Sequence, residues 1–247
     1  MSDTIVKVSD LYFSYPSRKD IKVLEHICFS VGRGEAVGII GANGAGKSTL
    51  LRILTGLIEA DTGNVEIEGM TLEKKNFAQI RQKLAYVFQD SQNQLFLTKV
   101  RDELAFAPDN YRYSKEKKEK KIQEAVKITG IEKLLDRQVF HLSGGERKLV
   151  AIASVLTTEP SILLMDEPSA ALDPVNRRNL IQLLNRLPEA KIITSHDLDM
   201  IWDTCTRVIL MNKGSIVADG PVREILSDGT LLEKNGLEMP LRLQSIQ

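Results

Sequence analysis

The order of apolar and polar residues changes twice along this chain, and each change marks a different kind of structure. From Ile5 to Val31 apolar and polar residues alternate, with breaks at Pro16 and at Gly32-Arg33-Gly34. Alternation with a period of two is typical of half-buried strands, so this stretch predicts two or three antiparallel strands. Later apolar runs are short and nearly unbroken, which predicts strands buried in a central sheet. They lie at residues 36–40, 84–88, 162–165, 191–195 and 208–211.

A third pattern lies between these runs. From residue 98 to residue 156 the spacing becomes helical and charged, and the run from Lys115 to Lys121 is its most polar part. We interpret that run as the solvated face of a helix and the segment as a helical subdomain inserted into an α/β core. The pattern therefore predicts one domain over residues 1–247, with its core at 1–97 and 157–228, the helical subdomain at 98–156 and a tail at 229–247.

A glycine-rich loop follows the first of the buried runs. It reads Gly41-Ala42-Asn43-Gly44-Ala45-Gly46-Lys47-Ser48, and helical spacing begins at Thr49. Glycines let successive backbone N–H groups turn inward around phosphate oxygens, and the next helix adds the positive end of its dipole. Lys47 then reaches the β- and γ-phosphates, and the Ser48 hydroxyl ligates Mg²⁺. The alternative is a glycine-rich turn before an ordinary helix, but the order strand, loop, helix favours nucleotide binding.

Two carboxylates end another buried run. Asp166 and Glu167 follow Ile162–Met165, at the edge where open α/β sheets place their ligands. An acidic residue there can hold Mg²⁺ or its waters, and a second can take a proton from an attacking water. The alternative is that one Asp only caps the next turn. His196 ends a later strand, where it either has a structural role or contacts a γ-phosphate.

Two further stretches also admit two interpretations each. Ser143-Gly144-Gly145-Glu146 begins a helix, either as a cradle of backbone N–H groups for an anion or as a capping box. Spacing alone favours the capping box. Tyr15 lies among strand aromatics and either packs within its sheet or stacks on an adenine ring.

Composition narrows the choice of partners. Lys and Arg together number 33, as do Asp and Glu, so no overall charge attracts this chain to nucleic acid. Cys28 and Cys205 share no metal-ligand or redox spacing, and we expect both to be buried reduced thiols. No apolar run has the length of a membrane span. We therefore expect a cytosolic chain that reaches a membrane only through a partner.

Taken in order, these stretches resemble the ATP-binding subunit of ABC transporters along almost the whole chain. The resemblance rests on the phosphate loop, Gln89 after a strand, the 143–146 signature, the 162–167 strand, Ser169-Ala170-Ala171-Leu172-Asp173 and His196. It implies a P-loop NTPase (RecA-like) core that binds ATP and Mg²⁺. Residues 41–49 would hold the phosphates, and Tyr15 would be the adenine-stacking aromatic.

The resemblance also implies a separate role for each residue around the γ-phosphate. Ser48 and Gln89 would lie at the Mg²⁺, and Asp166 would hold its waters. Glu167 would polarise the attacking water, while His196 would contact the γ-phosphate beside the catalytic Lys47.

The signature, Ser143 to Glu146, would complete the ATP site of a second subunit. One phosphate cradle leaves the γ-phosphate open on one side, and a second helix N-terminus can close it. Two chains would then enclose two ATP molecules head to tail, with Asp173 near the seam. The partner ATPase could be an identical or a different chain.

A narrower resemblance, to the energy-coupling factor group of importers, follows Gln89. It rests on residues 92–96, 100–106 and 107–110, with Gln94-Leu95-Phe96 expected to touch a transmembrane scaffold. A substrate-capture membrane protein would complete the complex at the cytoplasmic face of the membrane, and this chain would not contact the transported substrate. The tail at 236–241, and the pairing of the Ser143–Glu146 signature with the 195–199 stretch, are most similar to the cobalt/nickel branch.

Several alternatives remain beside this interpretation. The importer could carry a vitamin, or the chain could be a soluble ABC protein acting on nucleic acid or the ribosome, or a nucleotide-binding regulator without turnover. The balanced charge and the room for only one ATPase unit oppose the soluble protein. Glu167 and His196 oppose a regulator without turnover. Departures from the family pattern are Glu146, Leu149 and the Ala170-Ala171 pair, none of which removes a group that the chemistry needs.

Overall fold

A computed structural model describes residues 3–244 and confirms the α/β fold class, with an antiparallel sheet and a group of helices beside the main sheet. The main sheet has the strand order β10-β9-β3-β8-β7-β6, and only β10 runs antiparallel to its neighbour. Every residue of β3, β7 and β8 is buried, as a parallel sheet covered on both faces requires. The six strands are β3 (Ala36–Ile40), β6 (Leu84–Val87), β7 (Ile162–Asp166), β8 (Ala190–Thr194), β9 (Arg207–Asn212) and β10 (Ser215–Pro221).

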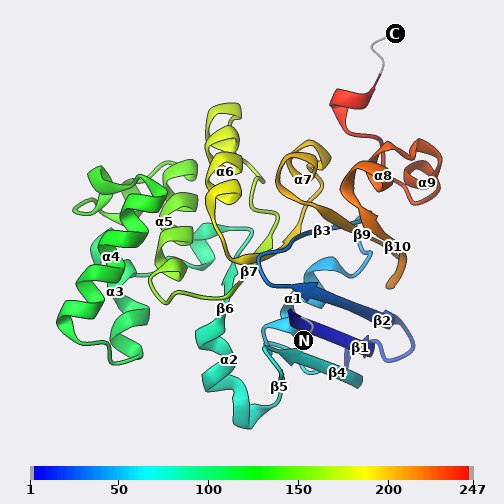
Figure 1. The fold of residues 1–247 in the computed structure, drawn as a ribbon, viewed down its shortest axis with the longest axis horizontal. Coiled ribbons are helices and arrows are strands. Elements are labelled where there is room, and N and C mark those ends of the chain that lie inside the picture. The colour runs from blue at the N-terminus through cyan, green and yellow to red at the C-terminus, as the bar shows by residue number, and fades with distance from the viewer. Residues whose placement is uncertain (1–2, 245–247) are drawn as a thin grey trace.

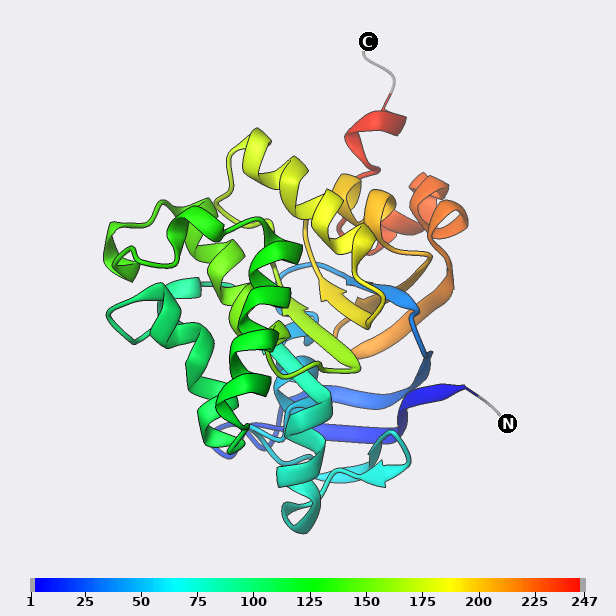
Figure 2. The same cartoon turned by 60° about the vertical axis from the view of Figure 1, so that its left-hand side comes forward.

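The two faces of the main sheet belong to two different cores. In β7, Ile162 and Leu164 pack toward α1 and the antiparallel sheet, whereas Leu163 and Met165 pack toward the outer helices. This alternation gives the layers visible in Figure 2, with the blue antiparallel sheet on one side and the yellow α6 on the other. The helices around the main sheet are α1 (Lys47–Leu54), α2 (Phe77–Lys83), α6 (Pro174–Arg186), α7 (Leu198–Thr204), α8 (Val222–Ser227) and α9 (Gly229–Lys234).

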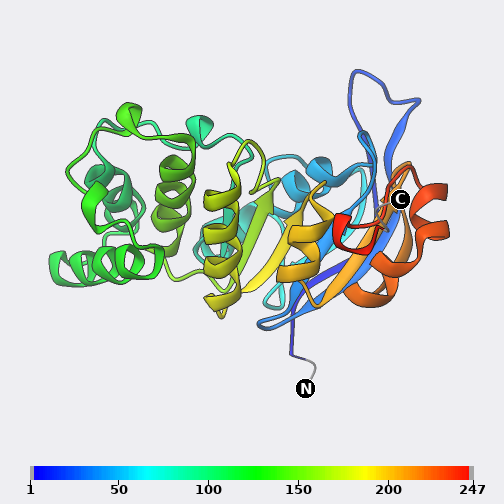
Figure 3. The ribbon, with the colours of Figure 1, turned by 90° about the horizontal axis from the view of Figure 1, so that it is seen from above.

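The antiparallel sheet has the order β2-β1-β4-β5 and contains the alternating N-terminal stretch. Its two long strands form a hairpin whose loop projects from the molecule in Figure 3. Register shifts interrupt the pairing of these strands at several points. The strands are β1 (Thr4–Ser14), β2 (Lys22–Gly32), β4 (Thr62–Ile67) and β5 (Met70–Thr71).

Three helices at one end of the molecule form a group with a core of their own. They are α3 (Val100–Asn110), α4 (Lys115–Thr129) and α5 (Gly144–Leu156). In α5, Ile152 and Leu156 also join the core of the main sheet, so this helix links the two units. Five side chains of the 115–121 run are exposed and two are half-buried, which confirms the solvated face. Within residues 3–244, no helix is both long and apolar enough to cross a bilayer.

The last described residues of the tail dock on α7. Arg242 Nε lies 2.8 Å from Asp199 Oδ1, and the two terminal nitrogens of Arg242 lie 2.6 and 2.7 Å from the carboxylate of Asp203. The Leu241 N–H donates to Asp199 Oδ2 at 2.9 Å. The tail is therefore tied to α7 by a bidentate ion pair and a backbone hydrogen bond. Residues 1–2 and 245–247 of the predicted domain lie outside the described residues.

The expectation that both cysteines are buried is wrong for one of them. Cys205 is 6% exposed, and burial raises the pKa of its thiol to about 12. Cys28, by contrast, is exposed. Its neighbours Ile27 and Phe29 point into the core, so the period of two places Cys28 on the outer face of β2.

Candidate functional site

The phosphate loop connects β3 to α1 in a conformation that glycine permits. Gly41 and Gly46 have φ values of +152° and +102°. A Cβ on Gly41 would lie 2.3 Å from the Met211 carbonyl oxygen, and one on Gly46 would lie 2.7 Å from Leu24. The backbone here therefore excludes side chains for two reasons, torsion and space. The loop closes tightly and α1 begins directly after it, at Lys47.

Lys47 folds back over this loop. Its ammonium donates to the Gly41 carbonyl at 2.7 Å and to the Ala42 carbonyl at 3.3 Å, and it lies 3.3 Å from His196 Nε2. The residue is 7% exposed. Burial lowers the pKa of Lys47, while the nearby Glu167 and Asp166 oppose that shift. The loop thus holds a desolvated cation where an anion can approach.

Asp166 ends β7 and collects hydroxyl donors from three other elements. The Ser48 hydroxyl donates to Asp166 Oδ1 at 3.1 Å, and the Thr194 hydroxyl donates to the same oxygen at 2.6 Å. The Tyr86 hydroxyl donates to Oδ2 at 3.1 Å. Burial and the Asp166 charge raise the pKa of Tyr86, so this phenol stays protonated and keeps donating. Sequence reasoning found Ser48 and Asp166 but not Thr194 or Tyr86.

Glu167 and His196 meet across the ends of β7 and β8. The backbone N–H of His196 donates to Glu167 Oε2 at 3.0 Å, and His196 Nε2 lies 3.4 Å from Glu167 Oε1. Glu167 has a φ of +45°, which is uncommon for a residue with a side chain. Its Oε1 is buried and accepts no hydrogen bond from any residue that the structure describes, because the contact with His196 lacks hydrogen-bond geometry. Glu167 borders the cleft and has one buried acceptor oxygen that no described residue uses.

One cleft of about 480 Å³ joins most of the predicted site residues. Tyr15 borders it, with its hydroxyl 3.1 Å from Thr49 Oγ1 and its ring edge-on to Phe13. Gln89 is exposed and borders the same cleft, although among the described residues no side-chain hydrogen bond joins it to Ser48 or Asp166. The lining residues are Tyr15, Val23, the loop residues 43–49, Gln89, Glu167 and His196.

The oxygen groups here fit a small divalent cation. Ser48, Asp166 and Gln89 supply hydroxyl, carboxylate and amide oxygens, which are the donors that Mg²⁺ takes, together with water. Glu167 follows Asp166 in the chain and borders the same cleft as Ser48 and Gln89, and a carboxylate there can accept a proton from a water.

The signature residues lie outside this cleft. Ser143 Oγ accepts from the Glu146 N–H at 3.2 Å, and Glu146 Oε2 accepts from the Ser143 N–H at 2.8 Å, so the capping box is present. This hydrogen bond from the Ser143 backbone lowers the pKa of Glu146, and Arg137 adds to the shift. Gly145 packs so closely against α6 that a Cβ would lie 2.3 Å from Asn176 Cγ. Gly144 has open space instead and borders a different cleft.

A buried lysine links the signature helix to Gln89. Lys148, on α5, is 3% exposed and donates to the Phe88 and Gln89 carbonyls, each at 2.9 Å. Gln94 adds a second link, since its side chain accepts from the Phe88 N–H and donates to Ala151 O. Burial lowers the pKa of Lys148 to about 8. Sequence reasoning missed Lys148, although its position on the apolar face of α5, beside Ala151 and Ile152, can be recognised in the sequence.

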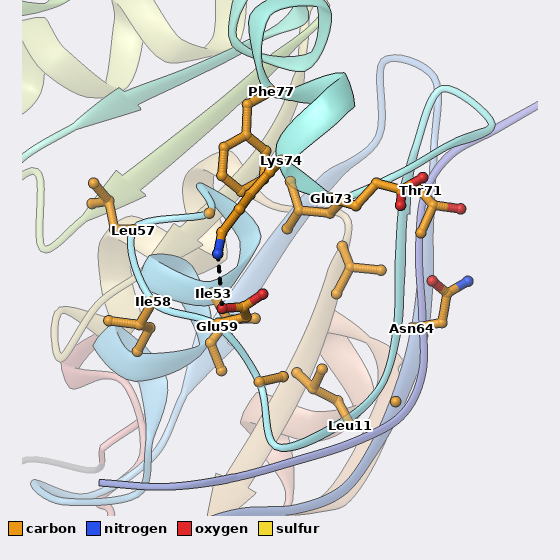
Figure 4. Close-up of a pocket in the computed structure, with 15 residues that line it drawn as sticks. Leu11, Ile53, Leu57, Ile58, Glu59, Asn64, Thr71, Glu73, Lys74 and Phe77 are labelled. Carbon is orange, nitrogen blue, oxygen red and sulfur yellow. Dashed lines mark ion pairs between the residues drawn. The ribbon is translucent and has the colours of Figure 1, made fainter. Parts of the chain in front are cut away.

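A second cleft, of about 350 Å³, has a different character. It lies between the end of α1, β4 and α2, and Figure 4 shows mostly apolar walls, including Leu11, Ile53 and Phe77. Its charged groups are at the rim, where Lys74 Nζ lies 3.8 Å from Glu59 Oε2 and both side chains are more than 80% exposed. The lining residues bring no buried charges together, so this cleft offers no comparable chemistry.

Comparisons with known proteins agree with the geometry. The family model described as ABC transporter matches residues 24–170. A protein of Gloeobacter violaceus, provisionally named as an ABC transporter ATP-binding protein, is 44% identical over 96% of this chain and 97% of its own. The energy-coupling factor transporter ATP-binding protein EcfA1 of Oenococcus oeni is 39% identical over 98% of this chain and 88% of its own.

Two solved structures have the same fold. CbiO1 of Clostridium perfringens, described as part of the ABC transporter complex CbiONQ, superposes with a TM-score of 0.85 at 33% identity, over 94% of each chain. The ATP-binding cassette MJ0796, in a dimeric post-hydrolysis state with ADP and Pi, gives a TM-score of 0.79 at 28% identity, over 89% of this chain and 99% of that one.

Proposed function

This chain belongs to the ABC transporter family and is an ABC ATPase, and on that premise we propose that it powers a membrane importer of the energy-coupling factor type. One observation carries the ATP-hydrolysing part of the proposal: the neighbouring strands β3, β8 and β7 bring the phosphate loop, His196 and the Asp166-Glu167 pair to one edge of the sheet. Open α/β sheets bind their ligands at such an edge. The similarity to EcfA1 supports the importer type.

Within the site, binding and hydrolysis fall to different residues. The backbone of residues 41–49 and the Lys47 ammonium would bind the ATP phosphates, and Tyr15 would stack on the adenine. Ser48, Gln89 and Asp166 would hold Mg²⁺, which offsets charge on the phosphate oxygens when bound. The unused Glu167 oxygen would accept the proton of the attacking water, and His196 would contact the γ-phosphate.

A second ATPase subunit, identical or different, would complete each site. In one chain the signature Ser143–Glu146 lies outside the cleft that holds the phosphate loop. The positive end of α5 is nevertheless suited to a phosphate, so the geometry favours its use by a partner chain. Two chains would enclose two ATP molecules head to tail, and the dimeric state of MJ0796 supports the dimer itself.

The membrane partners would dock at a groove on the helical group, between the segment before α3, the turn at Val139–His141 and the start of α5. This groove, of about 380 Å³, is lined by residues 92 and 95–98 and by Val139, Phe140 and Arg147. Phe96 and Phe140 are 65% and 64% exposed, which is unusual for such large apolar side chains. A helix of a transmembrane scaffold at the cytoplasmic face of the membrane would cover them. A substrate-capture protein would bind the cargo, and this chain would touch neither cargo nor nucleic acid.

Cobalt or nickel is the cargo that we propose. The support is the resemblance to the cobalt/nickel branch in the tail at 236–241 and in the pairing of the 143–146 signature with the 195–199 stretch. A vitamin is the second candidate, since the similarity to EcfA1 supports the importer type without distinguishing its cargo. Co-expression with the membrane proteins of adjacent reading frames, followed by uptake of radiolabelled cobalt, nickel and vitamins, separates the two. Vitamin uptake without metal uptake would overturn the metal cargo and leave the ATPase intact.

Glu167→Gln tests the hydrolytic role. The variant keeps the shape of the side chain but cannot accept the proton, so we expect hydrolysis to fall by about 10²- to 10⁴-fold. ATP should still bind and should now trap a dimer, which size-exclusion chromatography with ATP detects. Glu233→Gln, on the exposed side of α9, is the matched control. Unchanged turnover in Glu167→Gln would contradict the role assigned to Glu167.

A further inference from the structure

Two β-bulges of the antiparallel sheet bring together chemically reactive side chains on its exposed face, and these side chains do not line the phosphate-loop cleft. Val8 pairs with Phe29 and Leu11 with Ile27, so β1 has one extra residue between these pairs. Phe13 then pairs with Leu24, so β2 has its extra residue next. Each bulge holds a residue with left-handed backbone, Asp10 at φ +51° and His26 at φ +52°. A bulge changes the direction of its side chains, and here the Asp10 and His26 side chains point toward each other.

Cys28 is the third member of the group. It follows His26 by two residues on β2, so both side chains lie on the exposed face of that strand. His26 Nδ1 lies 2.5 Å from Asp10 Oδ1, and the Asp10 N–H donates to Cys28 Sγ at 3.1 Å. One nitrogen, one sulfur and one carboxylate oxygen thus all lie within 4.8 Å of one another.

A simpler explanation accounts for only part of this arrangement. Asp and His tolerate positive φ better than most residues, and an exposed Asp–His pair can form wherever the two are neighbours. Glycine would fit both bulges with less strain, however. The pairing of the bulges also does not require a thiol between them, and an exposed cysteine is unusual because cysteine is among the most buried residue types.

We propose that Asp10, His26 and Cys28 bind Zn²⁺, a divalent ion of intermediate softness for which Co²⁺ serves as the spectroscopic substitute. Thiolate, imidazole and carboxylate are ligands of these ions, whereas Mg²⁺ avoids sulfur and nitrogen. Bonds of about 2.0–2.3 Å would spread the ligand atoms to about 3.3 Å or more, so the Asp10 and His26 side chains must separate slightly. Both are more than 60% exposed and have room to do so. The Cys28 thiol loses its proton to solvent as the ion binds, and water completes the coordination.

Titration of the metal-free, full-length protein with CoCl₂ tests this proposal, in a buffer with a non-chelating reductant. A Co²⁺–thiolate bond gives near-ultraviolet charge-transfer absorption, which we expect to saturate at one equivalent and to disappear on adding ZnCl₂. Cys28→Ser should abolish this band. His26→Gln and Asp10→Asn should weaken Co²⁺ binding by at least about tenfold, since even outer-sphere partners contribute that much at metal sites.

Matched variants identify the site and separate it from the nucleotide cleft. Cys205→Ser removes the buried thiol and His141→Gln removes an exposed imidazole elsewhere, and neither should change the spectrum. Without added transition metal, Cys28→Ser should hydrolyse ATP like the wild type, which shows that the fold is intact. A wild-type titration without the thiolate band, or an unchanged band in Cys28→Ser, would overturn the site. A failure of the ATPase assay alone would concern only the proposed function.

Discussion

The phosphate loop and the signature are both glycine-containing turns that open a helix, yet the structure builds them in opposite ways. The loop gathers partners from distant parts of the chain: Lys47 meets His196, and Ser48 meets Asp166. The signature is satisfied locally, since Ser143 and Glu146 cap each other. One site is assembled by the order of strands in the sheet, and the other by four consecutive residues.

This difference explains why only one of the two looks complete within a single chain. The phosphate-loop cleft has a buried cation, an unused carboxylate oxygen and several hydroxyl groups. The signature has a rigid helix start whose side chains are already paired. A rigid, internally satisfied element is suited to act on another molecule, because it needs no rearrangement to present its helix dipole.

The largest effect that we expect comes from a substitution in the phosphate loop. Lys47→Ala removes the buried ammonium, and hydrogen bonds to charged groups contribute about 1.5–3 kcal/mol each, so ATP affinity should fall by about 10- to 100-fold. Binding of a fluorescent ATP analogue measures this loss. Lys127→Ala, exposed on α4, should bind ATP as the wild type does. ATP affinity within twofold of the wild type in Lys47→Ala would show that the loop backbone suffices.

A pair of adjacent substitutions tests the signature half. Gly145→Ala forces a Cβ against Asn176 and should lower the free energy of unfolding by about 1–3 kcal/mol. Gly144→Ala meets open space and should stay within about 0.5 kcal/mol of the wild type. Urea denaturation gives both values. Adding Asn176→Ala to Gly145→Ala should restore most of the loss. As a control, both single variants should bind ATP normally as monomers. Equal stability of Gly144→Ala and Gly145→Ala would contradict the packing described for α5 and α6.

The smallest effect that we expect concerns Lys148, which connects the signature helix α5 to Gln89 at the phosphate-loop cleft. Its pKa is lower in the folded protein, about 8, than the ordinary 10.5, so above pH 8 the unfolded chain binds more protons and stability rises with pH. Relative to Lys148→Met, the wild type should therefore gain about 1 kcal/mol of unfolding free energy between about pH 7 and pH 9. Denaturation curves at the two pH values measure this gain, with Lys127→Met as control. A difference that does not change with pH would mean that Lys148 titrates normally.

The sequence predicted those parts of the molecule that depend on local pattern. Alternation located the antiparallel strands, apolar runs located β3, β6, β7, β8 and β9, and charged helical spacing located α4. The capping interpretation of Ser143 and Glu146 is also confirmed, because a capping box depends on residues only three positions apart. The roles of the predicted site residues remain predictions, although the structure brings most of them into one cleft.

What escaped prediction depends on which strands become neighbours. Thr194 and Tyr86 reach Asp166 only because β8 and β6 flank β7, and no spacing along the chain encodes that order. Lys148 reaches Gln89 across a sequence separation of 59 residues. Cys28 is exposed because it lies on the outer face of β2. A bulge beside Cys28 interrupts the alternation of buried and exposed residues, so the sequence alone does not show which face it lies on.

The contact of Arg242 with α7 offers a way to measure conformational change in this protein. Arg242 holds Asp199 and Asp203 on α7, and α7 begins two residues after His196. Any shift of His196 that moves α7 should therefore also move the tail. A fluorophore on the tail, paired with one on the hairpin loop of β1 and β2, would convert that shift into an optical signal and leave the nucleotide cleft itself unlabelled.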